Sequence, residues 1–135
     1  LYDVAPGGGL TQISTGALLG SFRALDEERT WTAPDGRPFR PWHLYTEDSV
    51  QPVKPGEVTR FDVEVFPTFW RLAAGHALRM TITTSDTPHL LPIPAQMLNL
   101  LGGVYRVQRN AGAASFLEIP LAPASAFATP CGICG

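Results

Sequence analysis

The sequence predicts an all-β domain, and two observations support that prediction. Thirteen Gly and 13 Pro are spread along the whole chain of 135 residues, and these residues punctuate short extended segments. Residues 58–67 and 76–86 alternate apolar and polar side chains with a period of two. Such alternation is typical of strands with one buried and one solvated face. The length suits a single domain.

Composition narrows the classes of function. Hydrophobic residues make up 44% of the chain and charged residues 16%, which is a globular composition. The net charge is -2 with mixed signs and no basic stripe, so we expect no nucleic-acid partner. No apolar run reaches the roughly 18–20 residues of a membrane span, so we expect no membrane partner. We find no signal peptide, glycine-rich dinucleotide motif or P-loop.

The first predicted element is the stretch LYDVAPGGG. Tyr2 and Val4 lie on one side of an extended segment, which residues 6–9 then break. A chain that opens inside a strand is expected to be a fragment of a longer protein, although a processed protein could begin in the same way. Residues 13–23 are predicted to be extended, with Gly16 and Gly20 allowing a bulge or close packing. Residues 35–55 are rich in Pro and are predicted to form a long surface loop.

The two central strands are the clearest predictions. In residues 58–67 three apolar side chains face one side and two carboxylates face the other: Phe61, Val63 and Val65 against Asp62 and Glu64. Pro67 cannot donate to a ladder and ends the run. In residues 76–86 the predicted apolar face consists of Leu78, Met80 and Ile82.

Three weaker elements complete the chain. Residues 105–108 and 114–121 are candidate strands. Residues 94–101 form a candidate short helix, with Pro94 in the first turn and Gly102 just past the end. This helix is either a lid on an open sandwich edge, which we prefer, or one wall of a ligand groove. We expect a domain at residues 1–123 and a flexible tail at 124–135.

No catalytic constellation is found in the sequence. A serine hydrolase of the α/β type needs a G-x-S-x-G elbow, and none of the serines has those flanking glycines. His76 follows Gly75 and is either a general base or ligand, or a corner residue whose ring hydrogen-bonds a loop carbonyl; we favour the corner. Asp86 precedes Thr87-Pro88, where it is expected to cap the strand end.

Metal and redox chemistry also lack a complete set of ligands. The three His residues are scattered without metal-ligand spacing. Cys131 and Cys134 form a C-x-x-C pair that could serve redox chemistry or half of a zinc site. No further ligands follow, so we expect a frayed tail and no metal or cofactor. Two cysteines near one end say little about compartment, and a cytoplasmic location is slightly favoured over a secreted one.

Aromatic side chains gather outside the alternating strands, at Trp31, Trp42, Tyr45, Phe69 and Trp70. Exposed rings can stack sugars or dock a neighbouring domain, and their density favours docking. The candidate residues for docking or for walling a substrate cleft are Trp42, His43, Phe69, Trp70 and His89.

Taken in order, five motifs resemble the C-terminal domain of the X-Pro dipeptidyl-peptidase and cocaine esterase family of serine hydrolases. They are LYDVAPG at 1–7, GALLGSFR at 16–23, PGE at 55–57, the strand closing in PT at 61–68, and AGHALR with its run to SD at 74–86. The resemblance covers about residues 1–123. The loop HLLPIPAQMLNLLGG after Pro88 and the Cys131–Cys134 tail depart from the family pattern.

The resemblance implies a galactose-binding-like jelly-roll β-sandwich, here without its first strands. It also implies an upstream α/β-hydrolase domain that carries the catalytic Ser, Asp and His, and it is compatible with homo-oligomers. The expected function is that of a non-catalytic domain that packs on the catalytic domain and shapes its cleft. The alternative is a free-standing carbohydrate-binding module with Trp31, Trp42 or Trp70 as stacking platforms.

Overall fold

The computed structural model describes residues 1–84 and 103–127. Within those ranges it contains five short strands, two 3₁₀ turns and no α-helix. The elements are β1 (Tyr2–Val4), β2 (Leu10–Gln12), β3 (Trp31–Thr32), β4 (Pro38–Arg40), η1 (Glu47–Ser49), β5 (Ala77–Arg79) and η2 (Ala124–Phe127). The predicted all-β class is confirmed, while the jelly-roll connectivity stays a prediction.

A three-stranded antiparallel sheet has the order β2-β1-β5. In its central strand Val4 lies opposite Leu10 on one side and Ala77 on the other. The β1–β2 turn is closed by the Gly8 amide, which donates to the Ala5 carbonyl at 2.8 Å. Gly8 has φ +84, a conformation that glycine adopts without steric cost. The extended segment at residues 2–4 and the glycine-rich break at residues 6–9 therefore lie where the sequence predicts them.

A second, two-stranded sheet is the β3–β4 hairpin, in which Trp31 pairs with Arg40. Its turn contains Asp35-Gly36, where Gly36 has φ +81 and the Asp35 carboxylate accepts from the Arg37 amide at 3.1 Å. The prediction of one continuous loop over residues 35–55 was wrong here. Asp-Gly between extended residues is a strong hairpin signal, and the abundance of Pro had outweighed it.

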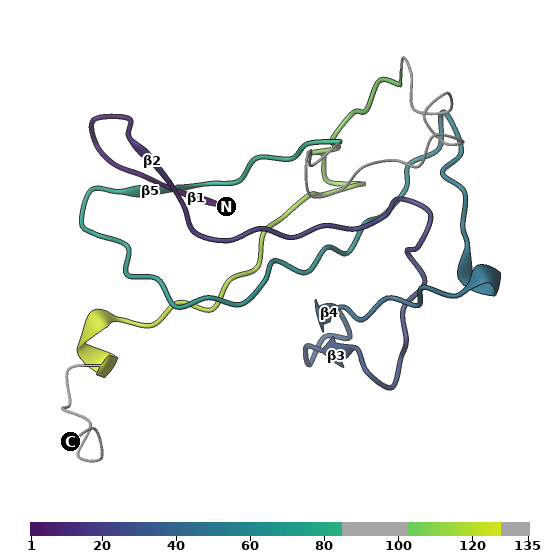
Figure 1. The fold of residues 1–135 in the computed structure, drawn as a ribbon, viewed down its shortest axis with the longest axis horizontal. Coiled ribbons are helices and arrows are strands. Elements are labelled where there is room, and N and C mark those ends of the chain that lie inside the picture. Colours follow the sequence, from purple (N-terminus) through teal and green to yellow (C-terminus); the bar gives the residue numbers. More distant parts are fainter. Residues whose placement is uncertain (85–102, 128–135) are drawn as a thin grey trace.

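Long extended segments without ladders make up much of the remaining chain. Residues 13–18, 58–67, 104–109 and 114–121 run extended (Figure 1) but contain no named strand, and turns at 19–22 and 110–113 interrupt the longer stretches. Single bonds tie some of them, such as Phe66 N–H to the Thr15 carbonyl at 2.8 Å. The prediction of paired strands in these segments was wrong. Alternation shows which side of a segment is apolar, but it does not show whether a neighbouring strand is present to form a ladder with it.

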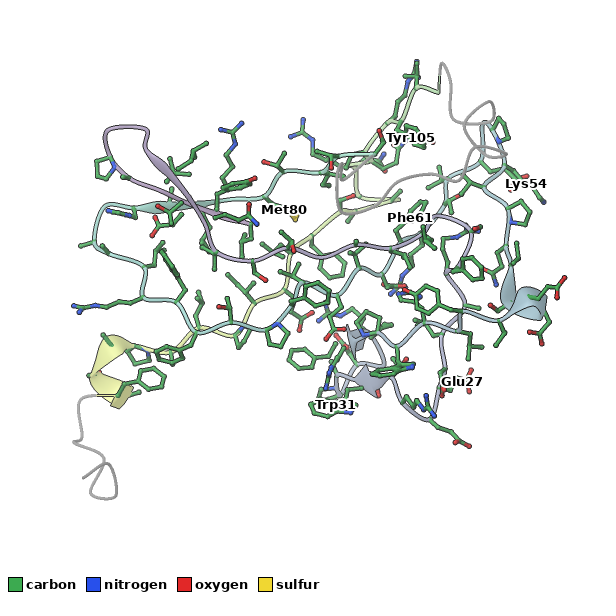
Figure 2. The ribbon with its side chains drawn as sticks, viewed as in Figure 1. Glu27, Trp31, Lys54, Phe61, Met80 and Tyr105 are labelled. Carbon is green, nitrogen blue, oxygen red and sulfur yellow. The ribbon has the colours of Figure 1, made fainter. Side chains whose placement is uncertain are left out.

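The described residues do not enclose a hydrophobic core. No aliphatic or aromatic side chain in these ranges is buried apart from Pro41, and side chains spread outward along the ribbons (Figure 2). The chain exposes 11316 Å², whereas a folded monomer of 14.6 kDa exposes about 6,900 Å². The apolar surface is consequently far more open than in an ordinary domain of this size.

Several predictions lie outside the described residues, namely the cap at Asp86, the role of His89, the helix at 94–101 and the cysteine pair Cys131–Cys134. Of the tail predicted at 124–135, the first four residues form η2. In the part of the chain that the structure covers, no helix is long and apolar enough to cross a membrane.

Candidate functional site

The most tightly bonded polar cluster centres on Asp3, in the middle strand β1. Its side chain is 8% exposed and accepts two hydrogen bonds. One comes from Trp70 Nε1 at 2.9 Å, and the other joins Asp3 Oδ1 to His76 Nδ1 at 2.6 Å. Since Trp70 and His76 come from segments 67 and 73 residues away, this carboxylate ties three separate parts of the chain together.

The electrostatics of the cluster favour the ionised carboxylate. The hydrogen bond from Trp70, followed by that from His76 and the charge of its imidazolium, lowers the pKa of Asp3 despite the opposing effect of desolvation. A carboxylate flanked by an imidazole is also the orienting half of a catalytic triad. In a triad the nucleophile lies on the other ring nitrogen, Nε2, and among the described residues no serine hydroxyl is hydrogen-bonded to His76. His76 is a hydrogen-bonded corner residue as predicted, but its partner is the Asp3 carboxylate in β1 and not the predicted loop carbonyl.

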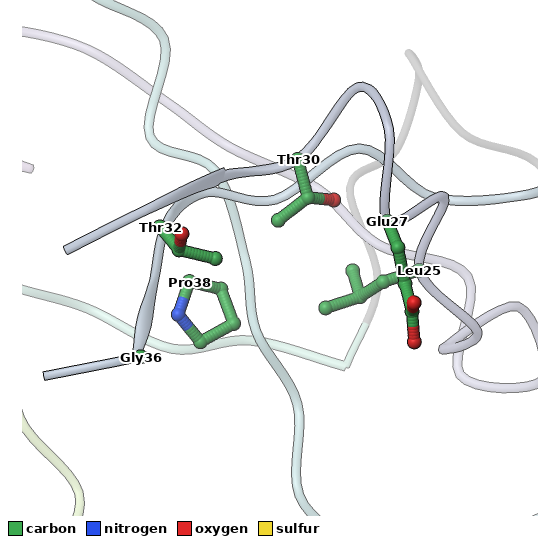
Figure 3. A pocket seen from close by; sticks show the side chains of 6 residues that line it. All are labelled: Leu25, Glu27, Thr30, Thr32, Gly36 and Pro38. Atoms are coloured by element: carbon green, nitrogen blue, oxygen red, sulfur yellow. The ribbon is translucent and has the colours of Figure 1, made fainter. Parts of the chain in front are cut away.

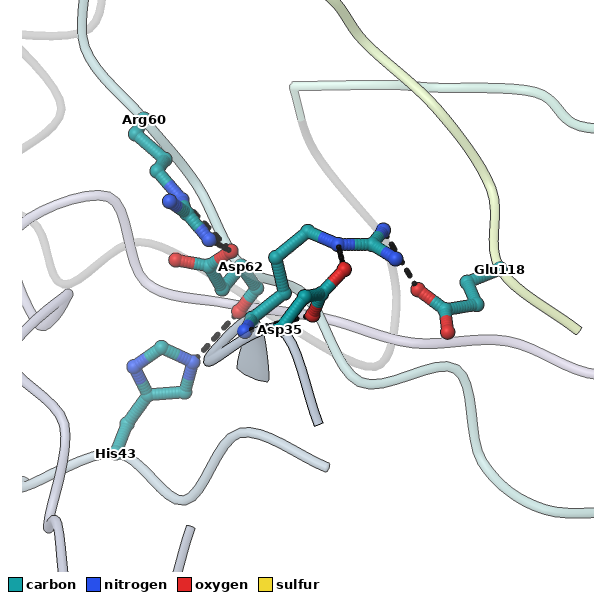
Figure 4. A network of polar contacts seen from close by, with 6 residues as sticks. Asp35, His43, Arg60, Asp62 and Glu118 are labelled. Carbon is teal, nitrogen blue, oxygen red and sulfur yellow. Dashed lines mark hydrogen bonds and ion pairs between the residues drawn. The ribbon is translucent and has the colours of Figure 1, made fainter. Parts of the chain in front are cut away.

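His43 forms a second internal contact. The residue is 8% exposed, and its Nε2 lies 2.7 Å from the carbonyl oxygen of Asp62 (Figure 4). Since a carbonyl only accepts, Nε2 carries the proton. Nδ1 is buried and has no partner among the residues described. The imidazole therefore joins the 41–45 segment to the 58–67 segment from inside.

A network of ion pairs surrounds this contact (Figure 4). Arg37 lies 2.6 Å from Asp35 and 3.0 Å from Glu118, while Arg60 lies 2.8 Å from Asp62. The hydrogen bonds from Arg37 lower the pKa of Asp35, and the Asp35 carboxylate raises the pKa of Arg37. These pairs are mostly exposed, so each stabilises the fold only slightly.

Arginine side chains cover aromatic rings on and near the β3–β4 hairpin. The guanidinium of Arg40 lies 5.1 Å from the centroid of Trp31, and that of Arg29 lies 5.6 Å from Trp42. Arg40 also binds Glu64 at 3.0 Å. The two indoles thus lie in cation–π contacts supplied by the chain itself, although Trp31 remains 59% exposed.

A shallow hollow of about 300 Å³ lies beside the hairpin (Figure 3). Its lining consists of Leu25, Glu27, Thr30, Thr32, Gly36 and Pro38. The Thr30 hydroxyl already accepts from the Trp42 amide at 3.0 Å, and Glu27 is exposed. The hollow therefore presents no pair of nucleophile and base. In the described ranges, no group of three or more His, Cys, Asp and Glu side chains could hold a metal ion.

The side chains of residues 61–64 are exposed on the wrong side for an isolated domain. The apolar Phe61 and Val63 are 42% and 44% exposed. The side chains of Asp62 and Glu64 on the opposite side are 25% and 27% exposed. Phe61 and Val63 therefore leave apolar surface open to water, at a free-energy cost proportional to its area.

An aromatic pair lies at η2. The rings of Phe69 and Phe127 meet edge to face, with centroids 5.0 Å apart and planes at 86°. Such contacts stabilise more than the area they bury. Even so, Phe69 is 77% exposed and Phe127 is 58% exposed.

The structure distributes the five predicted docking or cleft residues over different environments. Trp42 is 43% exposed and Phe69 far more so, whereas His43 is buried. Trp70 is 44% exposed and bound to Asp3, and His89 lies outside the described residues. Their roles at a domain boundary stay predictions.

Sequence reasoning missed Asp3 and Phe127. The charged residue within the otherwise apolar stretch LYDV was a signal for Asp3, because a strand carboxylate needs partners when it is buried. Phe127 had no such signal, since it stands apart from the other aromatic residues and was assigned to the tail.

Comparison with known proteins agrees with the sequence resemblance. The family described as the X-Pro dipeptidyl-peptidase C-terminal non-catalytic domain matches residues 1–115. Two curated relatives, one from Mycobacterium bovis and one from Mycobacterium tuberculosis, each bear the name putative serine esterase. Each is 27% identical over 121 residues, which are 90% of this chain and 18% of the relative. No solved structure matches the chain.

Proposed function

The chain belongs to the family of X-Pro dipeptidyl-peptidase C-terminal non-catalytic domains, and from that premise we propose that it is the accessory β domain of a serine hydrolase. The polypeptide that would carry both this domain and an α/β-hydrolase catalytic domain is called the parent protein below. In this proposal the domain packs on the catalytic domain, helps to wall its cleft and keeps water from it. The reaction class is cleavage of an ester or acyl-peptide bond.

The observation that carries the proposal is the exposure of Phe61 and Val63, two apolar side chains within residues 58–67. Phe61 and Val63 are more exposed than the carboxylates that alternate with them. The chain as a whole exposes roughly 4,400 Å² more than a folded monomer of its mass. A standard protein–protein interface covers only about 800 Å² on each partner. An extensive, permanent cover fits this surplus better than a transient partner does.

Additional strands upstream of Leu1 are part of the proposal. The extended segments 13–18 and 58–67 have few ladder bonds, and backbone N–H and C=O groups inside a protein are almost always paired. Strands supplied by the parent protein would satisfy them and would also cover Phe61 and Val63. The jelly-roll sandwich implied by the family resemblance would then be complete.

Catalysis is assigned to the other domain. Acyl transfer needs a serine activated by histidine, and among the described residues the His76 ring is bonded to Asp3 and to no serine hydroxyl. We expect the isolated chain to hydrolyse a p-nitrophenyl ester no faster than the uncatalysed background rate. Hydrolysis above background that survives His76→Ala would contradict a non-catalytic role.

The position of the cleft wall is a separate part of the proposal. Trp42, Phe69 and Trp70 are the described candidates with exposed ring surface, and His89 is the candidate from the departing loop. Alanine substitution of Trp42 or His89 in the parent protein should raise KM for one acyl group more than for another, with little change in thermal unfolding. By contrast, Trp70→Ala would also remove the hydrogen bond to Asp3. If none of these substitutions changes the substrate preference, this domain does not line the cleft.

The carbohydrate-binding alternative has less support from the structure. Arg40 and Arg29 already stack on Trp31 and Trp42, and Trp70 donates its N–H to Asp3. Titration with oligosaccharides should therefore leave the tryptophan fluorescence unchanged. Saturable quenching would favour the sugar-binding function.

A further inference from the structure

Two exposed aromatic clusters of the described residues differ in whether arginine side chains of the same chain stack on their rings. One is the Phe69–Phe127 pair at η2, and the other is the group of rings on and near the β3–β4 hairpin. We propose that the Phe69–Phe127 pair is the anchor that docks the catalytic domain of the parent protein, and that the hairpin cluster stays outside that interface. This inference rests on the proposed function and identifies the surface that performs it.

Phe69 is held in place by its neighbour. Trp70 donates its indole N–H to the nearly buried carboxylate of Asp3 at 2.9 Å, which fixes the side of the segment that faces β1. Successive side chains of an extended segment point to opposite sides, so Phe69 is directed away from the Asp3 cluster. Its 77% exposure is thus built into the fold, and a ring that is already ordered loses less entropy on binding.

Phe127 enlarges the anchor from a distant part of the sequence. Its ring meets Phe69 edge to face at 5.0 Å, and η2 places it there (Figure 1). Leu121, which is 80% exposed, precedes the turn. Neither Phe69 nor Phe127 is among the aromatic rings with an arginine stacked on them. Large aromatic side chains of this kind are typical anchors at the centre of an interface.

The hairpin cluster has its own polar cover. Arg40 lies over Trp31 and is paired with Glu64, and Arg29 lies over Trp42 and is 3.6 Å from Asp26. Burying these ion pairs under another domain would cost desolvation. Carboxylates are depleted from the core of interfaces, so Glu64 and Asp26 beside these rings favour the rim or a solvated part of the protein.

The occupant of the anchor is inferred from length and area. The matched relatives named as serine esterases extend far beyond this chain, which spans 18% of each. The surplus of exposed surface, roughly 4,400 Å² on this chain alone, exceeds the roughly 1,000–2,500 Å² that each partner contributes to an obligate contact, and it exceeds the area of a transient contact still more. A catalytic domain in the same polypeptide meets both conditions, because it is large and permanently attached.

The test is hydroxyl-radical footprinting of the intact parent protein, with each labelling rate divided by the rate in the unfolded protein. We expect Phe69 and Phe127 to be labelled several-fold more slowly than Trp31 and Tyr45. A fluorophosphonate probe on the same sample reports independently whether an active-site serine is present. A labelled serine with freely labelled Phe69 and Phe127 would overturn the anchor alone, whereas the absence of any such serine would contradict the proposed function.

Matched substitutions provide a second measurement. In the parent protein Phe69→Asp should increase the rate of proteolytic separation of the two domains several-fold, because a carboxylate at the anchor resists burial. Phe39→Asp is the control, since Phe39 is 50% exposed on the hairpin. Equal effects of the two substitutions, or none from Phe69→Asp, would contradict the inference.

Discussion

At the scale of single residues, the Asp3 side chain links distant parts of the chain. It is the carboxylate that joins β1 to Trp70 and to His76. Sequence patterning located the strand correctly but assigned no role to Asp3, its polar position. Alternation assumes one wet face, and a strand paired on both sides, as β1 is by β2 and β5, can instead bury a carboxylate if donors meet it.

Asp3 should give the protein a measurable acid sensitivity. Its pKa is lowered in the folded state, so the ionised carboxylate contributes stability above the ordinary pKa, and that contribution is lost as the pH falls through the folded pKa. We expect Asp3→Asn to lower the thermal midpoint of the parent protein at pH 7. The gap from the natural protein should narrow as the pH falls below about 4.

Asp35→Asn is the matched control for that titration. Asp35 also has a lowered pKa, but its side chain is 52% exposed beside Arg37, and exposed pairs stabilise little. Its thermal midpoint should stay close to that of the natural protein at every pH. A constant gap between Asp3→Asn and the natural protein from pH 7 to pH 3 would show that the Asp3 contacts do not depend on its charge.

Gly16 makes the closest backbone approach in the described chain. A Cβ there would overlap the carbonyl oxygen of Glu64 and lie 3.1 Å from Val65 Cα. Since backbone atoms cannot move aside as a side-chain tip can, Gly16→Ala should lower the free energy of unfolding by about 1–3 kcal/mol.

Gly7→Ala is the control, because nothing lies within 4 Å of its Cβ position. Its effect should stay within about 0.5 kcal/mol. Both values are read from chemical denaturation of the parent protein. Equal stability of the two variants would mean that residues 13–23 do not pack on residues 62–66.

At the scale of elements, turns were easier to predict than ladders. The glycine break after β1 and the corner before β5 both follow from local chemistry, because a positive φ demands glycine whatever surrounds it. The strands at 58–67 and 114–121 depended on distant neighbours, which no local pattern specifies. The candidate site was also predicted only in part. The aromatic candidates were identified from the sequence, but their contacts with Asp3 and Phe127 were not.

The corner at Gly75 leads directly into β5. Gly75 has φ +79, and the nearest atom to a Cβ there would be Pro6 Cγ at an ordinary 3.5 Å. Gly75→Ala should therefore cost about 1–2 kcal/mol from backbone strain alone. Gly9→Ala, whose Cβ would lie 3.8 Å from Ala5 Cβ with no positive φ, should cost clearly less in the same denaturation experiment.

At the scale of the whole molecule, the exposed apolar surface is the dominant property. The isolated chain should bind a hydrophobic dye strongly and self-associate, because open strand edges and apolar faces pair with other chains. Light scattering after size-exclusion chromatography measures the mass. A monodisperse monomer that unfolds cooperatively and does not bind the dye would show that the chain folds without further polypeptide on its apolar surface.

The most direct test of the central claim is hydrogen–deuterium exchange of residues 58–67, compared between the isolated chain and the intact parent protein. If further polypeptide completes the fold here, these amides should exchange rapidly in the isolated chain and become strongly protected in the parent. Equal protection in both, with Phe61 and Val63 still exposed in the parent, would contradict the account of this chain as a domain completed by its catalytic partner.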